Sequence, residues 1–139
     1  MEPTKEEQNK SVYTHLTQGK CRRVLVVEDE RSVQDVLSEL LRWMGFEVAL
    51  AGNGVEALAI FIENSFDLVL TDLQMPIMDG SRLAHLIKER SPNTPVVLLT
   101  SADRQTVRDK VKSGSIDSVL FKPFLLNDFQ STLRRVLAL

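Results

Sequence analysis

Short apolar runs alternate with longer stretches of mixed polarity along most of this chain. The runs are nearly continuous in valine, leucine and phenylalanine, which is typical of strands that are buried on both faces of a sheet. Gly and Pro residues separate several of the runs from their neighbours. The pattern predicts strands over 24–27, 46–50, 67–71, 96–99 and 117–121.

In the intervening stretches apolar residues recur at intervals of three and four, the spacing of one helical face. Strand-then-helix units that repeat in this way predict an α/β fold, a doubly wound, five-stranded parallel sheet with five helices on its two faces. In the second helix the spacing places Val55, Leu58, Ala59 and Ile62 on one face. The predicted helices cover 31–44, 54–63, 80–90, 104–113 and 127–138, and Gly45 caps the first.

Four of the five predicted strands stop at a polar residue of a kind that phosphoryl chemistry uses. The carboxyl ends of parallel strands lie along one edge of the sheet, where open α/β sheets place their sites. Three carboxylates, a hydroxyl and an amine would therefore converge on one pocket. They belong to Glu28, Asp29, Asp72, Thr100 and Lys122.

The three carboxylates would repel one another and raise each other's pKa unless a cation lay between them. With Lys122 included, the group keeps a formal surplus of two negative charges, which one divalent ion would neutralise. An all-oxygen ligand set favours Mg²⁺ or Mn²⁺ over zinc. A hard metal, a lysine and a hydroxyl stabilise the oxygens of a transferring phosphoryl group. Asp72, at the end of the third strand, is the best-placed nucleophile.

Composition narrows the class of protein. The 139 residues, 43% hydrophobic and 26% charged, suit one domain with a single core. Residues 1–21 are mostly polar and are interpreted as an N-terminal extension, with the domain over 22–139. A net charge of −2 argues against direct nucleic-acid binding, and no apolar stretch is long enough for a membrane helix. The start lacks a signal peptide and Cys21 is the only cysteine, so we expect a cytoplasmic protein without an internal disulfide.

Four motifs, each at a strand end, resemble those of the response-regulator receiver domain over roughly residues 22–139. They are Val24–Glu30 (VLVVEDE), Leu70–Gly80 (LTDLQMPIMDG), Pro95–Ser101 (PVVLLTS) and Phe121–Phe124 (FKPF). The resemblance implies a flavodoxin-like, chemotaxis-regulator-like fold with strand order 2-1-3-4-5. It also implies a phosphorylation-dependent switch of two-component signalling. Such a domain is not an enzyme, apart from catalysing its own phosphorylation and slow autodephosphorylation.

By the same resemblance Asp72 is the phosphoacceptor, and a histidine kinase or a histidine phosphotransfer protein is the donor. Glu28, Asp29, Asp72 and the backbone carbonyl of Gln74 would hold Mg²⁺. Thr100 would hydrogen-bond the phosphoryl group, Lys122 would pair with it, and the Lys122–Pro123 peptide bond is expected to be cis.

The resemblance also implies that the phosphorylated state is relayed by conformational change. The sequence shows no output domain after the last helix, so we expect the effect to pass to a downstream partner protein, unless the chain is a fragment of a larger kinase or regulator. A homodimer through the fourth and fifth helices is left open.

Three positions depart from the family pattern. Val119 stands three residues before the lysine, where the family usually carries Tyr or Phe. Gly114 lies one residue early in the loop before the last strand. Ala102 follows Thr100 by two residues, where many members have a polar or charged side chain that can orient water. Gln74 is then the only nearby candidate for that role, and we expect slow autodephosphorylation.

Other interpretations of the same residues are open at this point. Glu28 and Asp29 could cap the first helix, Asp79 suits a cap of the third helix better than a metal site, and Ser101 competes with Thr100. A degenerate receiver would act as a constitutive protein-interaction module. A flavodoxin-like protein that binds FMN or a nucleotide would need a phosphate loop after the first strand, where this chain has an acidic run.

Overall fold

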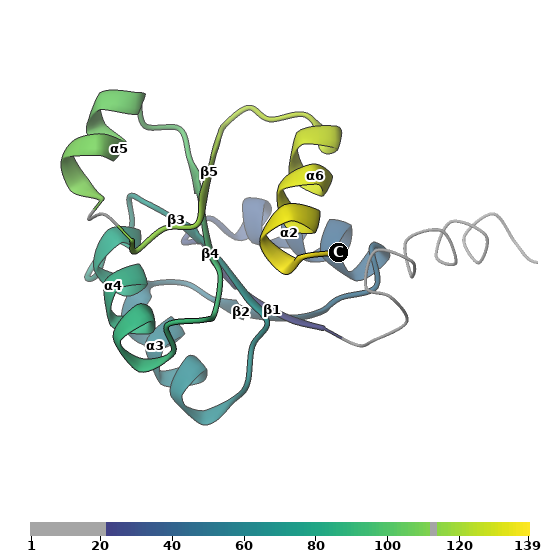
Figure 1. Cartoon of the computed structure of the whole chain (residues 1–139), viewed down its shortest axis with the longest axis horizontal. Coiled ribbons are helices and arrows are strands. Elements are labelled where there is room, and N and C mark those ends of the chain that lie inside the picture. The colour runs from purple at the N-terminus through teal and green to yellow at the C-terminus, as the bar shows by residue number, and fades with distance from the viewer. Residues whose placement is uncertain (1–21, 112–113) are drawn as a thin grey trace, which may run out of the picture.

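The computed structural model describes residues 22–111 and 114–139 and has one sheet of five parallel strands in the order β2-β1-β3-β4-β5 (Figure 1). The strands are β1 (Arg23–Val27), β2 (Glu47–Ala51), β3 (Leu68–Asp72), β4 (Val96–Thr100) and β5 (Ser118–Phe121). The helices are α2 (Arg31–Trp43), α3 (Gly54–Glu63), α4 (Gly80–Arg90), α5 (Arg104–Lys110) and α6 (Leu126–Leu137). The predicted fold class and strand order are confirmed. The proposed extension over 1–21 lies outside the described residues.

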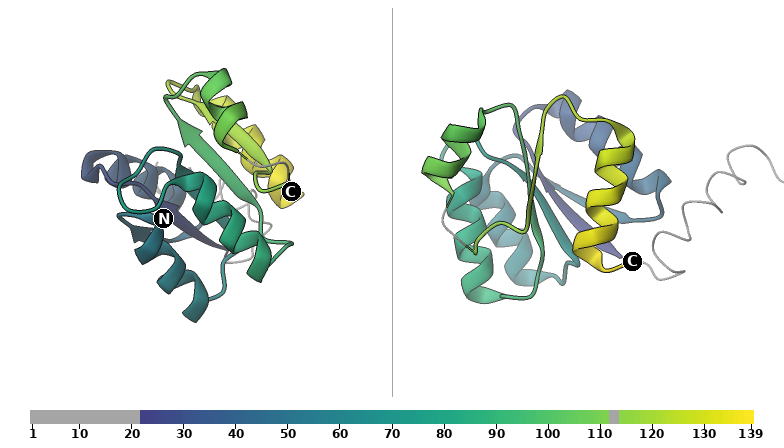
Figure 2. Two further views of the ribbon diagram at one scale, coloured as in Figure 1. Left: turned by 90° about the vertical axis from the view of Figure 1, so that its left-hand side faces the viewer. Right: turned by 45° about the horizontal axis from the view of Figure 1, so that its top comes forward.

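The helices form two layers, one on each face of the sheet (Figures 1 and 2). Helices α2 and α6 cover the face that presents Val24 and Val26 of β1. Helices α3 and α4 cover the opposite face, which presents Leu25 and Val27, and α5 packs beside them through Val107. Because successive strand residues point to opposite faces, both faces of a nearly continuous apolar strand are buried.

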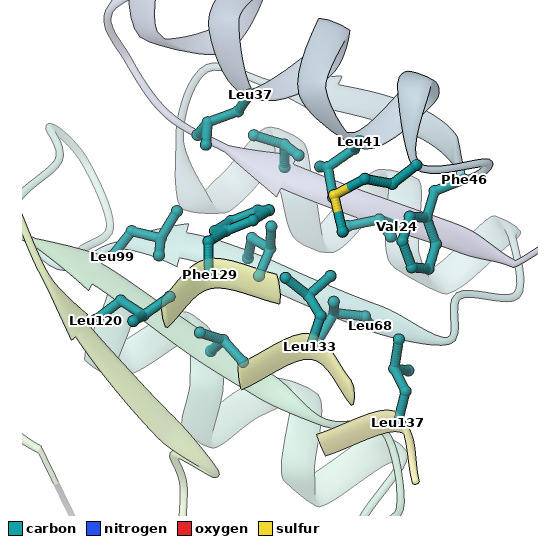
Figure 3. Packing of buried hydrophobic residues seen from close by; sticks show 14 residues of the cluster. Val24, Leu37, Leu41, Phe46, Leu68, Leu99, Leu120, Phe129, Leu133 and Leu137 are labelled. Atoms are coloured by element: carbon teal, nitrogen blue, oxygen red, sulfur yellow. The ribbon is translucent and has the colours of Figure 1, made fainter. Parts of the chain in front are cut away.

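The larger core lies between the sheet and the pair α2 and α6, as Figure 3 shows. Phe129 of α6 is fully buried there, and its ring stacks on Phe124 with 5.5 Å between centroids. Leu41 and Met44 contribute side chains from the end of α2. Gly45 follows with a positive φ of 97°, which confirms its predicted place after the helix. Among the described residues, no helix is long and apolar enough to cross a membrane.

Only part of the apolar face that the spacing indicates in α3 is buried. Ala57 and Phe61 lie in the core with Leu58 partly buried beside them, whereas Val55 and Ile62 keep 49% and 46% of their surface exposed. Phe61 decides the orientation, since its ring stacks on Phe66 in the core with 6.1 Å between centroids. Helix α3 is apolar on nearly all sides, so helical spacing alone could not show which side is buried.

Helix α5 is shorter than its predicted span of 104–113. It ends at Lys110, and Val111 already has an extended backbone with φ −93° and ψ 121°. Val107 is the only residue of α5 that is buried, and Arg104 adds a contact by lying over the ring of Phe121, with 4.8 Å from its guanidinium carbon to the ring centroid. Few side chains therefore secure the helix to the domain. The remaining predicted elements shift by one residue or less, as is usual for element boundaries.

The orientation of α3 gives the first prediction. Phe61→Ala should lower the free energy of unfolding by about 3 kcal/mol or more, because it removes a buried ring from the core. Ile62→Gln should change it by less than about 0.5 kcal/mol, because Ile62 lies on the exposed side. Urea denaturation of the two variants measures both values. Equal losses, or a larger loss for Ile62→Gln, would contradict the observed orientation.

Candidate functional site

The five predicted site residues do lie at one edge of the sheet. Glu28 and Asp29 follow β1, Asp72 and Thr100 are the last residues of β3 and β4, and Lys122 follows β5. The register keeps these strand ends level, since Val27 pairs with Thr71 and Thr100 pairs with Phe121. Parallel pairing therefore brings groups together that are far apart in the sequence.

Three carboxylates form the centre of the site. One carboxylate oxygen from each of Glu28, Asp29 and Asp72 lies within 4.8 Å of the others. Glu28 is almost fully buried with 3% of its surface exposed, Asp72 is half-buried, and Asp29 is exposed. Converging carboxylate oxygens, one of them open to solvent, suit a hard divalent cation. The donor set therefore fits Mg²⁺.

Lys122 is the basic partner of this cluster. Its Nζ lies 3.3 Å from Oε2 of Glu28 and 3.9 Å from Oδ2 of Asp72. Its backbone N–H donates to the carbonyl of Thr100 at 2.7 Å, which fixes the chain where β5 ends. The Lys122–Pro123 peptide bond is cis, as the resemblance implied. One ammonium group thus pairs with two of the three carboxylates.

The environment favours protonation of two of the acids. Burial raises the pKa of Glu28, and the backbone N–H of Glu30 and the charge of Lys122 oppose that shift only in part. Burial also raises the pKa of Asp72 against the opposing charge of Lys122 and backbone hydrogen bonds from Leu73 and Gln74. The expected direction is confirmed, but burial is a larger cause than repulsion between the carboxylates.

Thr100 is buried at the end of β4, and its Oγ1 accepts a hydrogen bond from the N–H of Ala102 at 3.0 Å. Its neighbour Ser101 is exposed. Thr100 therefore holds the start of the loop that leads to α5. Val119 and Ala102 are both partly buried around Val107, in the small cluster beneath α5.

The loop after β3 wraps closely around Asp72. Leu73 N–H donates to Oδ1 of Asp72 at 2.7 Å, and Gly80 N–H donates to the carbonyl of Leu73 at 2.8 Å. A Cβ atom on Gly80 would lie only 2.0 Å from the backbone oxygen of Asp72. Gly80 is thus a site residue that sequence reasoning missed as such. The Asp79-Gly80 pair marked the turn without revealing this close approach.

The same loop carries a strained residue. Ile77 has a φ of 72°, an uncommon conformation for a β-branched side chain, and 81% of its surface is exposed. Gln74 is also exposed, and its backbone N–H is turned towards Asp72. Asp79 ends the loop by accepting hydrogen bonds from the N–H of Arg82 and the hydroxyl of Ser81. Its predicted role as the cap of α4 is confirmed.

One of the competing interpretations disagrees with the structure. The residue that caps α2 is Glu30, which makes no side-chain capping bond, so Glu28 and Asp29 are not its caps. Asn53 caps α3 by accepting from Glu56 N–H at 2.9 Å. His85 lies on α4, where it pairs with Glu89 at 3.0 Å.

Comparison with known proteins points to the same family as the four sequence motifs. The model of the response regulator receiver domain family matches residues 24–134, most of the chain. The chain belongs to this family. The receiver is 41% identical over 116 residues to the transcriptional regulatory protein ZraR of Klebsiella oxytoca, an alignment that covers 83% of this chain and 26% of that protein. The receiver thus spans about a quarter of the length of that relative.

Solved receivers share the fold. Response regulator TrrA of Thermotoga maritima, in complex with Mg²⁺ and a beryllium fluoride, superposes with a TM-score of 0.76 at 30% identity over 83% of this chain and 98% of that one. The receiver domain of sensor histidine kinase PA1611 from Pseudomonas aeruginosa PAO1, with magnesium in its active site cleft, gives 0.80 at 26% identity over 86% and 100%. The receiver is therefore a signalling domain of the two-component type.

The raised pKa of Asp72 gives a prediction for the metal-free receiver. The pKa of Asp72 is higher in the folded protein than in the unfolded chain. At pH values between these two pKa values the folded state binds more protons than the unfolded chain, so the free energy of unfolding falls as pH rises through that range. Asp72→Asn removes the charge. In EDTA its Tm should exceed that of the wild type by a gap that widens from pH 4 to pH 7.

The exposed Asp35→Asn on α2 is the matched control, for which no such pH-dependent gap is expected. Differential scanning calorimetry at each pH measures the gap for both variants. If the Tm difference between Asp72→Asn and the wild type stays constant or narrows as pH rises, the ionised Asp72 carboxylate does not destabilise the fold, and the prediction is wrong.

The close approach at Gly80 gives another prediction. Gly80→Ala should lower the free energy of unfolding by about 2 kcal/mol, because the methyl group would force the Asp72 backbone to move. In Gly52→Ala the Cβ would lie 3.5 Å from Oε2 of Glu56, an ordinary contact, so a loss below about 0.5 kcal/mol is expected. Urea denaturation compares the two, and equal losses would refute the specific constraint at Gly80.

Proposed function

We propose that the receiver accepts a phosphoryl group on Asp72 in a reaction that requires Mg²⁺. The observation that carries this proposal is the convergence of three carboxylate oxygens within 4.8 Å, with Lys122 between Glu28 and Asp72. Glu28, Asp29, Asp72 and the backbone carbonyl of Gln74 would hold the ion, and Mn²⁺ would substitute for it. When bound, the ion neutralises charge on the carboxylates and on the phosphoryl oxygens.

The two oxygens of Asp72 have different surroundings. Oδ1 accepts the N–H of Leu73, whereas Oδ2 faces Nζ of Lys122 at 3.9 Å. A carboxylate oxygen of Asp72 attacks the phosphorus of a phosphohistidine, the phosphorus–nitrogen bond breaks, and its electron pair leaves with the imidazole of the donor. Lys122 then pairs with the new phosphoryl oxygens, which compensates for its weakened contact with Oδ2.

The donor in this proposal is a histidine kinase or a histidine phosphotransfer protein, because those proteins carry phosphohistidine. Within the described residues, His85 does not replace that donor, because it lies on α4 away from the strand ends and pairs with Glu89. His15 falls outside the described residues. The receiver itself contributes only the acceptor and the groups that stabilise the transferred charge.

The structure suggests how phosphorylation alters the surface. The hydroxyl of Thr100 now accepts from Ala102, and a phosphoryl group on Asp72 would attract it as a donor. Losing the Ala102 contact frees the loop before α5, and Val107 is the only buried residue of that helix. We infer that the loop and α5 shift together, and that a downstream protein or output domain detects this change.

Two other candidate functions make different predictions. A constitutive interaction module would bind its partner without taking up phosphate, and Val119 in place of the usual aromatic residue is the feature that favours it. An FMN-binding or nucleotide-binding protein would have to place phosphate beside Glu28 and Asp29, whose charges would repel it.

The proposed function is tested by phosphorylation with acetyl phosphate and MgCl₂. Intact-mass spectrometry should show the addition of one phosphoryl group, lost in Asp72→Asn and in EDTA. Asp67→Asn is the matched control, because Asp67 precedes β3 and accepts from Arg23 N–H at the opposite edge of the sheet. Asp67→Asn should be labelled as the wild type is. Labelling that persists in Asp72→Asn, or a wild type that is never labelled, would overturn the proposal.

The apolar side chain at position 102 predicts a long-lived acyl phosphate. Ala102 is partly buried and offers only its backbone N–H, so it cannot orient water for attack on the phosphoryl group. Ala102→Glu should shorten the half-life of the phosphorylated receiver by about tenfold or more. Mass spectrometry after removal of acetyl phosphate measures the decay. A wild-type half-life no longer than that of Ala102→Glu would disagree with this interpretation.

A further inference from the structure

The side-chain amide of Gln34 connects the first turn of α2 to the ends of two strands. Its Nε2 donates to the backbone carbonyl of Glu28 at 2.5 Å and to that of Ala51 at 3.3 Å. The Ala51 carbonyl also accepts the N–H of Glu28 at 3.0 Å. The two N–H bonds of one amide group thus hold the chain where β1 and β2 end, directly behind the acidic cluster.

The peptide group held in this way joins Glu28 to Asp29. The Glu28 carboxylate has other supports, since Oε1 accepts from Glu30 N–H and Oε2 pairs with Lys122. Asp72 is held by the N–H of Leu73. In the described part of the chain no hydrogen bond or ion pair holds the Asp29 side chain. Its direction therefore depends on the backbone from which it projects.

We infer that Gln34 is a positioning residue for the cation site, acting on Asp29 through the Glu28–Asp29 peptide group. This inference rests on the proposed function. Gln34 reaches a backbone carbonyl and no carboxylate, so it contributes orientation without charge. Outer groups that orient ligands in this way commonly change metal affinity when they are removed.

The experiment compares Gln34→Met with the wild type. Methionine has a similar length and fills a similar volume but has no N–H to donate. At 25 °C and in low salt, MgCl₂ is titrated into ¹⁵N-labelled protein, and the shifts of the Glu30 and Leu73 amide signals give the dissociation constant. We expect that constant to rise about tenfold in Gln34→Met. The wild type should also show a pair of Gln34 amide protons that exchange slowly with water in EDTA.

Asn64→Leu separates positioning from general stability. Asn64 likewise donates from its side-chain amide to a backbone carbonyl, that of Ile60 at 2.9 Å, but it lies after α3 at the far end of that helix. Its loss should lower Tm and leave the Mg²⁺ dissociation constant unchanged. In Gln34→Asn the amide is one methylene too short, and an affinity loss like that of Gln34→Met is expected.

The outcomes are distinguishable. Suppose that the wild type binds Mg²⁺ and that the dissociation constant of Gln34→Met lies within twofold of the wild-type value. The role of Gln34 is then overturned, and the proposed function is left intact. Equal weakening in Gln34→Met and Asn64→Leu also overturns it, because a distant hydrogen bond would then matter as much. Wild-type protein that shifts no signal with Mg²⁺ overturns the proposed function and this inference together.

Discussion

Everything at the site depends on the crowding of three carboxylates beside one ammonium group. Burial already disfavours the charged forms of Glu28 and Asp72, and Lys122 offsets that penalty only in part. A fold selected for stability alone would not place these groups together, because unpaired buried charge is costly. The excess negative charge is useful only when a cation and a phosphoryl group arrive. The carboxylate cluster thus destabilises the free receiver locally, and the binding of a cation and a phosphoryl group would relieve that destabilisation.

The parallel sheet makes that crowding possible. Strands β1, β3, β4 and β5 end level with one another, and the helices that follow them leave the carboxyl edge open. The loops then set the finer geometry. Gly80 has no side chain, so the chain there can approach the backbone of Asp72 closely, and the amide of Gln34 hydrogen-bonds to the backbone where β1 and β2 end. Rigid strands therefore supply the positions, while the short loops supply the orientation.

The sequence alone predicted a parallel sheet and the residues at the strand ends, because short apolar runs and strand-end motifs are strong local signals. The strand order followed from the resemblance to the receiver family. It failed at α3, where Val55 and Ile62 match helical spacing as well as Phe61 does and only tertiary packing decides. It overextended α5, whose length depends on where Val111 leaves the helix. It gave no sign of Gln34, since an amide in a first helical turn is usually just exposed and solvated.

The central claim is that an oxygen of Asp72 reacts with phosphorus beside a divalent cation. The most direct measurement is ¹⁹F NMR of the receiver with beryllium fluoride, which adopts the shape of a phosphoryl group on a carboxylate. The account predicts a protein-bound fluoride signal that appears with MgCl₂, is absent in EDTA, and is lost in Asp72→Asn. A bound signal that persists in Asp72→Asn, or none in the wild type with Mg²⁺ present, would contradict it.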